Sequence, residues 1–593
     1  MGAPRAAGRD RSRHVPVMSV QKGGPTHWLT GWHLYFAVIA ACLALSLLWT
    51  LPVWLAPNHL IGLPGDPVSN AWNAAWVPFA LTHGLSPYQS AYLNAPSGIN
   101  NMWPAPTMLY IILVWPLTML ISPTLGYNAI MVLALTGTGA AAFALMIRFT
   151  HRRWLAAWAS GLFTFGPYEA SEVAGGHPDL AAVGSLLLLA LLTHELFISR
   201  NWKPRSVGLC IAALLLVQMV TSEEVLASAA IMAAIGTAIA LLIQRKLDRD
   251  VVPYVCSSLK WAAVALPPML AFFTFQWLAP GALHGQNASP SVYSAPLITY
   301  FIPGPSQQLS LPWTSSITQY VWGPKEELSS YLGVAVIVTL ILGLRRLRAP
   351  MLRWLLAMLV VSAVLTLGPA VRLKGGVSLP APEALLAMLP LVGNILPIRL
   401  GVYVDLFSVL AMVLVLDKVS WVSWVRYSAA SVVALTWVPS IPAPAISIPV
   451  PSAFTRQSPV LFTEPHAPDV VLLLPYVANG ATDAAMLWQA ADHFRFRVPE
   501  GYWVRLTIHQ PGNAYGPAAT EFTSSLVMVA TSGHVPAMNR RLRSSALAYL
   551  RSHDVGAIVL GPSVRRAQLE RFVDGVLRAR PHYINGVAIW RVN

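Results

Sequence analysis

Asp66 is the first residue in this sequence whose type and setting could do chemistry. It is the only acidic residue between Asp10 and Glu169. It stands at a Gly/Pro turn before an amphipathic helix whose residues Trp72 and Asn73 are candidate substrate contacts. A carboxylate at such a turn could act as general base on an incoming hydroxyl or amine. The competing interpretation, which the local spacing alone favours, is that Asp66 caps the helix beginning one residue later.

A second group of ionisable residues lies in two short polar stretches between apolar segments, and each member is a candidate substrate contact. One histidine among carboxylates could bind a divalent metal, although no metal-ligand spacing is diagnostic here. For any one of these carboxylates, a surface position facing water or a helix cap is the more frequent role. Their clustering in a charge-poor chain is the stronger evidence for a site. The group is Glu169, Glu172, His177, Asp179, Glu223 and Glu224.

Arg399 is a candidate contact for a phosphate, because a guanidinium binds phosphate in bidentate fashion. A lipid phosphate at the membrane surface would suit it, and an interfacial arginine that reaches toward water is the equally weighted alternative. The sequence has no Gly-rich phosphate loop, nucleophile elbow or zinc-protease helix. The sequence therefore shows no motif that would power ATP-driven transport.

The composition indicates that membrane-spanning helices position these groups. Of the 593 residues, 55% are hydrophobic and 11% are charged, whereas soluble domains carry roughly 25% charged residues. The net charge is +15, but the basic residues form short clusters between apolar segments rather than a nucleic-acid-binding surface. The three cysteines show no metal-ligand spacing and predict no disulfide framework.

The basic clusters predict the topology, because Lys and Arg concentrate in cytoplasmic loops. With every cluster inside, about eleven spans follow, with the N-terminus cytoplasmic and the C-terminus outside the plasma membrane. The apolar stretch 106–121 is short and contains Pro116, so we expect an interfacial or half-inserted helix there. The predicted parts are a cytoplasmic basic tail (1–30), a transmembrane domain (31–440) with its first outer loop at about 57–124, and an extracytoplasmic domain (441–593).

The C-terminal domain is predicted to be a small α/β domain. It opens with a Pro-rich stretch that is typical of a semi-rigid linker. Strands are expected at 470–474 and 556–560, a helix at 539–552, and an edge strand at 587–592. The fold class is thus an all-α polytopic membrane domain followed by a small α/β domain.

Several short motifs along the chain resemble the GT-C superfamily of membrane glycosyltransferases, and most closely its bacterial, YfhO-like members. The likeness covers most of the chain, and its motifs are short and degenerate. The stretches that carry it are Gly65-Asp66-Pro67 through Trp76, Asn94 to Asn100, Phe165 to Tyr168, Gly176 to Leu180, Thr221-Ser222-Glu223, Glu327 with Tyr331-Leu332-Gly333, and Leu389 to Arg399.

The resemblance implies inverting transfer of a sugar from a polyprenyl-phosphate donor. It makes Asp66 the general base on the outer face and Arg399 a candidate for the lipid phosphate; members differ in whether they use a metal. Two departures reduce the match. Tyr403 stands where many members have a further Arg, and Ala295 where relatives often have an acidic residue.

The leading hypothesis is therefore a GT-C-type glycosyltransferase of the hexosyltransferase class in the cell membrane. Its partners would be a polyprenyl-phosphate sugar and an envelope glycan, lipid or protein acceptor, with membrane lipids around it and no nucleic acid. No cofactor is certain, and a divalent metal is compatible. The alternatives are a non-catalytic scaffold or assembly factor for envelope polymers, and a transporter of lipids or other amphiphiles.

Overall fold

The computed structural model describes most of the chain from Trp32 onward. The described residues are 32–102, 107–244, 250–282, 288–318, 327–328, 330–372, 378–389, 392–455, 469–477, 483–506 and 513–592. The predicted cytoplasmic tail, 1–30, lies outside them.

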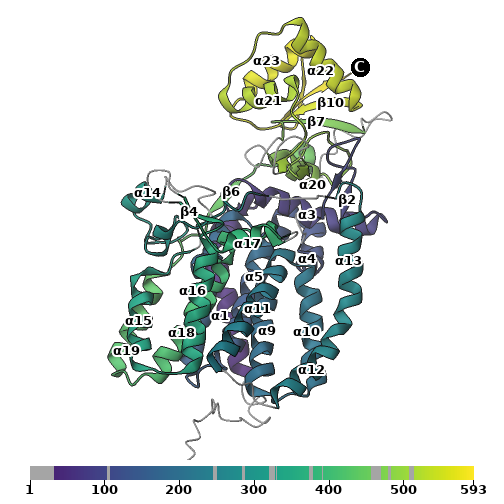
Figure 1. Ribbon diagram of the computed structural model, residues 1–593. Coiled ribbons are helices and arrows are strands. Elements are labelled where there is room, and N and C mark those ends of the chain that lie inside the picture. The colour runs from purple at the N-terminus through teal and green to yellow at the C-terminus, as the bar shows by residue number, and fades with distance from the viewer. Residues whose placement is uncertain are drawn as a thin grey trace, which may run out of the picture.

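Helices that run side by side form the body of the molecule, in the lower part of Figure 1. Six helical segments among the described residues are long and apolar enough to cross a bilayer, which makes the chain a multi-pass membrane protein. They are Trp32–Trp49 (α1), Pro123–Met146 (α5), Pro178–Ser199 (with α8, Pro178–Ala181, and α9, Gly184–His194), Glu223–Ile243 (in α11, Glu223–Gln244), Val251–Leu278 (α12, Val251–Ala262, and α13, Leu266–Leu278) and Pro397–Lys418 (with α18, Gly401–Lys418).

Five further helices of the bundle are shorter, with lengths from 12 to 17 residues. A helix needs about 20 residues to cross the hydrocarbon core, so length alone does not establish eleven crossings, and that number stays a prediction. The five are α6 (Arg153–Thr164), α10 (Pro204–Met219), α15 (Gly333–Arg346), α16 (Pro350–Thr366) and α19 (Ser423–Thr436).

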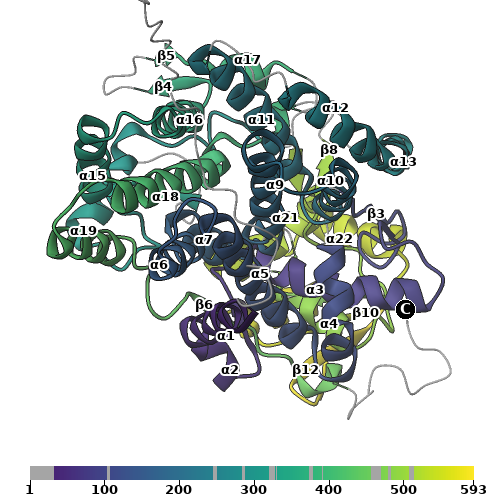
Figure 2. The same ribbon diagram turned by 90° about the horizontal axis from the view of Figure 1, so that it is seen from below.

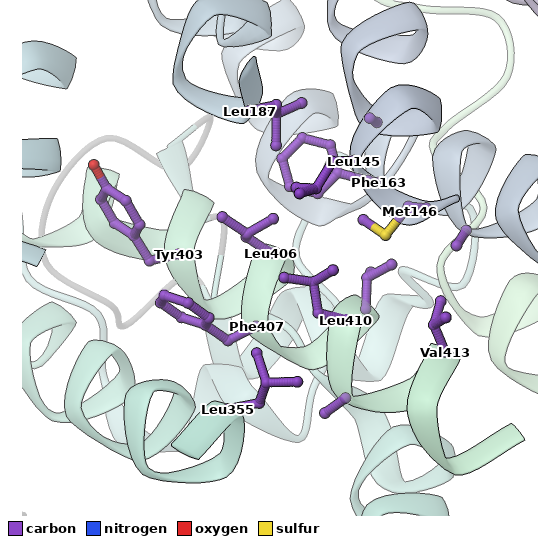
Figure 3. Packing of buried hydrophobic residues seen from close by; sticks show 14 of the residues in the cluster. Leu145, Met146, Phe163, Leu187, Leu355, Tyr403, Leu406, Phe407, Leu410 and Val413 are labelled. Atoms are coloured by element: carbon purple, nitrogen blue, oxygen red, sulfur yellow. The ribbon is translucent and has the colours of Figure 1, made fainter. Parts of the chain in front are cut away.

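Helix α18 lies in one half of the bundle, between α15 and α16 on one side and α6 on the other (Figure 2). It is apolar nearly all round, as a helix packed on every side must be. Figure 3 shows Leu406 and Leu410 directed toward Leu145 of α5 and Phe163 of α6. This core fixes the outer end of α18, where Arg399 precedes the helix.

The segment between α1 and α5, which is the predicted first outer loop, contains short elements rather than spans. Helix α4 has 13 residues and contains Pro116, so it is too short to cross the bilayer, in agreement with the expected short helix. Its depth in the membrane stays a prediction. The elements are α2 (Leu51–Leu55), β1 (His59–Ile61), α3 (Asp66–Thr82), β2 (Gln89–Ser90), β3 (Ile99–Asn100) and α4 (Met108–Leu120).

Five small elements lie at the same end of the bundle as α3 (Figure 1): α14 (Pro312–Thr318), β4 (Ala370–Arg372), α17 (Glu383–Ala387), β6 (Ala445–Ser447) and α20 (Ala484–Ala491). The other small elements are α7 (Pro167–Gly175), β5 (Ser378–Pro380), β8 (Val504–Leu506) and β9 (Asn513–Tyr515).

The last part of the chain contains a four-stranded sheet in the order β11-β12-β10-β7. Strands β7 and β10 are parallel and the other pairs are antiparallel. The sheet is formed by β7 (Val470–Leu474), β10 (Val555–Leu560), β11 (His582–Ile584) and β12 (Val587–Arg591), and its helices are α21 (Glu521–Ser532), α22 (Arg540–Ser552) and α23 (Arg566–Leu577).

The prediction that 587–592 forms an edge strand is wrong. Strand β12 pairs on both sides, and β11 is the edge. The two strands form a hairpin around Asn585 and Gly586, which both have positive φ. An Asn-Gly pair is the strongest short-range hairpin signal, so the sequence held the information for this extra strand.

The C-terminal region, residues 441–593, is attached to the segment between α1 and α5 at two places. Strand β6 pairs antiparallel with β1, so the Pro-rich stretch is anchored along part of its length. Helix α20 packs against α3, where the indole N–H of Trp72 donates a hydrogen bond to Gln489 Oε1 at 2.8 Å. Gln489 Nε2 donates to the carbonyls of Tyr92 and Phe496.

We expect Gln489→Ala to lower the free energy of unfolding. The substitution leaves the indole N–H of Trp72 and the carbonyls of Tyr92 and Phe496 without their hydrogen bonds to the Gln489 amide. The expected cost is about 1–3 kcal/mol. Thermal unfolding in detergent measures it, with Gln568→Ala as the control, since Gln568 is half-buried on α23. Equal melting temperatures for the two variants would contradict this account of the junction.

Candidate active site

His177 lies between two of the predicted site carboxylates. Its Nε2 is 2.8 Å from Asp66 Oδ2, and its Nδ1 is 2.8 Å from Glu172 Oε2. The imidazole is buried and the Glu172 side chain is 1% exposed, whereas the Asp66 side chain is 35% exposed. One carboxylate of the group is therefore accessible, and the histidine connects it to a buried one.

The loop that carries Asp66 is hydrogen-bonded on two sides. The backbone N–H of Leu63 donates to Ala174 O in α7, and that of Gly62 donates to Pro444 O next to β6, both at 2.8 Å. Asp66 itself is the first residue of α3. No side-chain cap bond is present at the start of α3, so the capping role that the spacing favoured is not the role that Asp66 has here.

Gly176 permits the close approach of this loop to α7. Its φ is +75°, a left-handed value that ends α7, and a Cβ atom would lie 2.5 Å from Pro67 Cγ. Its carbonyl accepts a hydrogen bond from Asn70 Nδ2 at 2.9 Å. Only glycine satisfies both the backbone conformation and the contact, and this places His177 beside Asp66.

Arg399 forms the second half of the site. Its Nη1 donates to Glu224 Oε2 at 2.7 Å, and its Nη2 and Nε donate to the two oxygens of Glu327 at 3.0 and 3.2 Å. The other Glu224 oxygen accepts from the backbone N–H of Leu396. A guanidinium has five N–H donors, and the described residues take up three of them.

The two halves meet at Glu327. Its Oε1 bonds Arg399 and lies 4.0 Å from His177 Nε2. The network thus contains four carboxylates (Asp66, Glu172, Glu224 and Glu327) and two cationic groups (His177 and Arg399). Its side chains come from α3, α7, α11 and the turns before α8, α15 and α18. We call this set the Asp66–Arg399 network.

The pKa values of Asp66 and His177 move in opposite directions. Burial disfavours the charged form of Asp66, but the hydrogen bond and charge of His177 overcome it and hold the pKa below its usual value. For His177, burial acts to lower the pKa, and the bonds to Asp66 and Glu172 raise it well above its usual value. At neutral pH the pair is therefore an ionised carboxylate and an imidazolium.

The residues do not form a ready metal site. Both imidazole nitrogens are within hydrogen-bond distance of carboxylates. Among the described residues, no three His, Cys, Asp or Glu side chains are grouped as a metal ion requires. The imidazolium supplies the positive charge between Asp66 and Glu172, so we derive no step that uses a metal.

The other predicted site residues lie around the network or in the core. Glu169 is fully buried, and neither carboxylate oxygen has a hydrogen-bond partner among the described residues. Asp179 lies within range of the charges of His177 and Arg399. Glu223 accepts from Gln276 Nε2. Trp72 and Asn73 are 1% and 3% exposed, and they bond Gln489 and Asn101 as packing residues rather than open substrate contacts.

Sequence reasoning missed four residues of the site. Glu327 appeared in a motif but without a role, and Tyr293, Tyr502 and Tyr515 had no part in the prediction. The Tyr502 side chain lies within range of the Asp66 carboxylate and helps to lower its pKa. Tyr293 and Tyr515 lie within range of the charges on Asp66 and Glu327. The tyrosines come from distant parts of the chain, and only the folded arrangement brings them to Asp66.

Solved structures with a similar fold are membrane glycosyltransferases. The mycobacterial arabinofuranosyltransferase AftD matches at 14% identity and TM-score 0.47, covering 93% of this chain and 40% of AftD. A variant of AftD matches at 13% identity and TM-score 0.50, covering 93% and 41%. The Archaeoglobus fulgidus oligosaccharyltransferase matches at 13% and 0.44, covering 90% of this chain and 70% of that one.

These likenesses are at 14% identity or below and concern the fold alone. This chain spans about two-fifths of the length of AftD. No family model matches the sequence, and no curated protein does.

The stability contributed by the His177–Asp66 pair should depend on pH in a defined direction. Because the pKa of His177 is raised on folding, its contribution is fully present below about pH 6.5 and is lost as the pH rises through the folded pKa. Because the pKa of Asp66 is lowered, its contribution is present above about pH 3.9 and is lost as the pH falls through the folded pKa.

We therefore expect His177→Gln to lower the melting temperature most at about pH 5–6.5, with a difference that shrinks at alkaline pH. Melting of both proteins from pH 4 to 10 measures it. His582→Gln, on the exposed strand β11, is the control. A difference that grows as the pH rises would show that His177 is neutral in the folded protein.

Proposed function

We propose that this protein is a membrane glycosyltransferase that moves a sugar from a polyprenyl-phosphate donor to an envelope acceptor, with inversion at the anomeric carbon. The observation that carries the proposal is the Asp66–Arg399 network. It joins an accessible, ionised carboxylate to an arginine of which two N–H donors have no partner among the described residues. A reaction that needs a base and a phosphate contact within one small site fits this pair.

Asp66 would act as the general base. As the acceptor oxygen attacks the anomeric carbon, its proton passes to the Asp66 carboxylate, the new C–O bond forms, and the bond from that carbon to the phosphate oxygen breaks. The lowered pKa keeps Asp66 in the form that accepts a proton. His177, which is already an imidazolium, has no free nitrogen lone pair and holds Asp66 in place.

Arg399 would contact the phosphate of the lipid donor. Glu224 and Glu327 fix the guanidinium from two directions, so its remaining N–H groups need no reorganisation when the phosphate leaves with its added charge. In the proposed topology of about eleven spans, with the N-terminus cytoplasmic, this site lies at the outer face of the plasma membrane.

The first test is transfer of labelled sugar from a panel of polyprenyl-phosphate donors by wild type and Asp66→Asn. Loss of a general base should reduce kcat/KM by about 10²–10⁴-fold. Asp554→Asn is the matched control, because Asp554 is exposed in the turn before β10. If the Asp66→Asn variant folds and transfers as fast as wild type, Asp66 is not the base. If no donor supports transfer by the wild type, a non-catalytic scaffold becomes the leading function.

Arg399→Lys should weaken donor binding, because lysine cannot hold Glu327 in bidentate fashion and still present a planar pair of donors. We expect the KM for the donor to rise about tenfold, with a smaller change in the KM for the acceptor. Steady-state kinetics with each substrate varied measure the two constants, and Arg348→Lys at an exposed position is the control. A rise confined to the acceptor KM would assign Arg399 to the acceptor instead.

A further inference from the structure

Asp405 is a fully buried carboxyl group inside helix α18, in the span Pro397–Lys418. An ionisable side chain within a membrane-spanning helix costs free energy and is a candidate for a functional role. Asp405 is not a member of the Asp66–Arg399 network, but it follows Arg399 by less than two helical turns. Its Oδ2 accepts a hydrogen bond from the backbone N–H of Tyr168 at 3.0 Å. Asp405 therefore connects α18 to another helix close to the site.

The Tyr168 N–H belongs to the first turn of α7. The first four N–H groups of a helix have no partner within it, and those of α7 find no local side-chain cap. Pro167 has no N–H to be capped, and Gly166 before it has no side chain that could cap the helix. The Asp405 carboxyl group thus supplies, from α18, the cap that the local sequence lacks. A carboxylate is also the group that a helix dipole favours at this end.

The other end of α7 carries one half of the Asp66–Arg399 network. Glu172 lies on the helix, and the N–H of His177 donates to the Glu172 carbonyl at 2.9 Å. The His177 ring then contacts Glu172 Oε2 and Asp66 Oδ2. The Tyr168 phenol donates to Leu180 O at 3.3 Å, so the first turn of α7 is bonded to the chain on the far side of His177 as well. A shift of the first turn of α7 would therefore move His177.

Helix α18 provides the reference for both halves of the network. Arg399 lies at its outer end and bonds Glu327, whose Oε1 is 4.0 Å from His177 Nε2. Asp405 determines where α7, and with it His177, lies relative to that end. The close apolar packing of α18 against α6 and α16 leaves this reference little freedom to move.

We propose that Asp405 is a positioning residue, which holds α7 in the place where His177 meets Asp66 and Glu327. It acts through the backbone of α7 and touches no reacting group. For transfer, this role rests on the proposed function; for the placement of His177, it does not.

Several ionisable groups face His177 and Asp405, and their titration contributes to any pH dependence. The groups around His177 are Asp66, Glu172, Asp179 and Glu327, and those around Asp405 are Tyr168, Glu169 and Tyr300. Burial raises the pKa of Glu169 well above its usual value, so this side chain is neutral beside the capped turn. None of these groups changes in the Asp405 variants, so their titration is common to the proteins compared.

Three substitutions separate the position of the Asp405 oxygen from its charge. Asp405→Asn keeps an oxygen opposite the Tyr168 N–H and removes the charge. Asp405→Glu keeps the charge and displaces the oxygens by one methylene group. Asp405→Leu keeps the shape of the side chain and removes the hydrogen-bond acceptor. Asp417→Asn and Asp417→Glu, near the other end of α18, are the matched controls.

Thermal melting of the full-length protein in detergent tests the placement of His177 without a transfer assay. The measured quantity is the change in melting temperature that His177→Gln causes in each background at about pH 5–6.5. We expect the wild-type change to persist in Asp405→Asn and to fall by about half or more in Asp405→Leu and Asp405→Glu. Equal changes in all backgrounds would overturn the proposal. If Asp405→Leu does not fold, the Asn and Glu variants decide the outcome.

In the transfer assay, Asp405→Leu and Asp405→Glu should lower kcat by about 10²-fold, because a misplacement of about 1 Å can cost that much. The donor KM should change little, since Glu224 and Glu327 hold Arg399 directly. The acid limb of the pH profile should move to higher pH, because Asp66 loses the imidazolium that lowers its pKa. Asp405→Asn should restore kcat to within roughly threefold of the wild type.

The outcomes distinguish this role from the proposed function. A smaller effect of His177→Gln in Asp405→Glu, with no transfer from any donor by the wild type, supports the positioning role and overturns the enzyme. Transfer with equal kcat and an equal pH profile in the wild type and Asp405→Glu overturns the positioning role and retains the enzyme. An Asn variant that loses activity while the Glu variant keeps it would show that the charge of Asp405 matters rather than its hydrogen bond, and this too would overturn the proposal.

Discussion

The contact between His177 and its two carboxylates is the constraint on which the outer half of this protein depends. Burying Glu172 costs free energy unless a cation meets it, and removing one member of a buried pair leaves an uncompensated charge. The bridging imidazolium must therefore be brought to a fixed point between two loops. The glycine at 176, the hydrogen-bonded turn at 62–66 and the pairing of β1 with β6 all serve that placement.

Asp66 is influenced by groups from two different parts of the chain. His177, which precedes a membrane helix, bonds it at 2.8 Å, and Tyr502 of the C-terminal region helps to lower its pKa. Docking of α20 on α3 thus affects the geometry of the carboxylate as well as the stability of the junction. A site built in this way is complete only when both parts are folded against each other.

Local sequence patterns predicted the helices and strands well, whereas contacts between residues far apart in the chain could not be predicted from them. The expected strand at 470–474 has the bounds of β7, and the expected helix at 539–552 differs from α22 by one residue. Asp66, Glu172, His177, Glu224 and Arg399 were all named and do meet. Trp72 and Asn73 were expected at an open site, but their polar atoms find buried partners, which single-sequence spacing does not reveal. The edge strand was misplaced because the Asn-Gly hairpin was overlooked.

Under the proposed function, the carboxylate partners of Arg399 prepare it before any donor arrives. A free arginine side chain would lose rotamer freedom on binding phosphate, whereas one already fixed by Glu224 and Glu327 has lost it on folding. The two carboxylates reduce the net attraction of Arg399 for an anion, but they also fix the direction of its remaining N–H groups. Such an arrangement binds the ground-state phosphate less strongly and favours the state in which negative charge develops on the departing oxygen, which is the condition for a faster reaction rather than tighter binding.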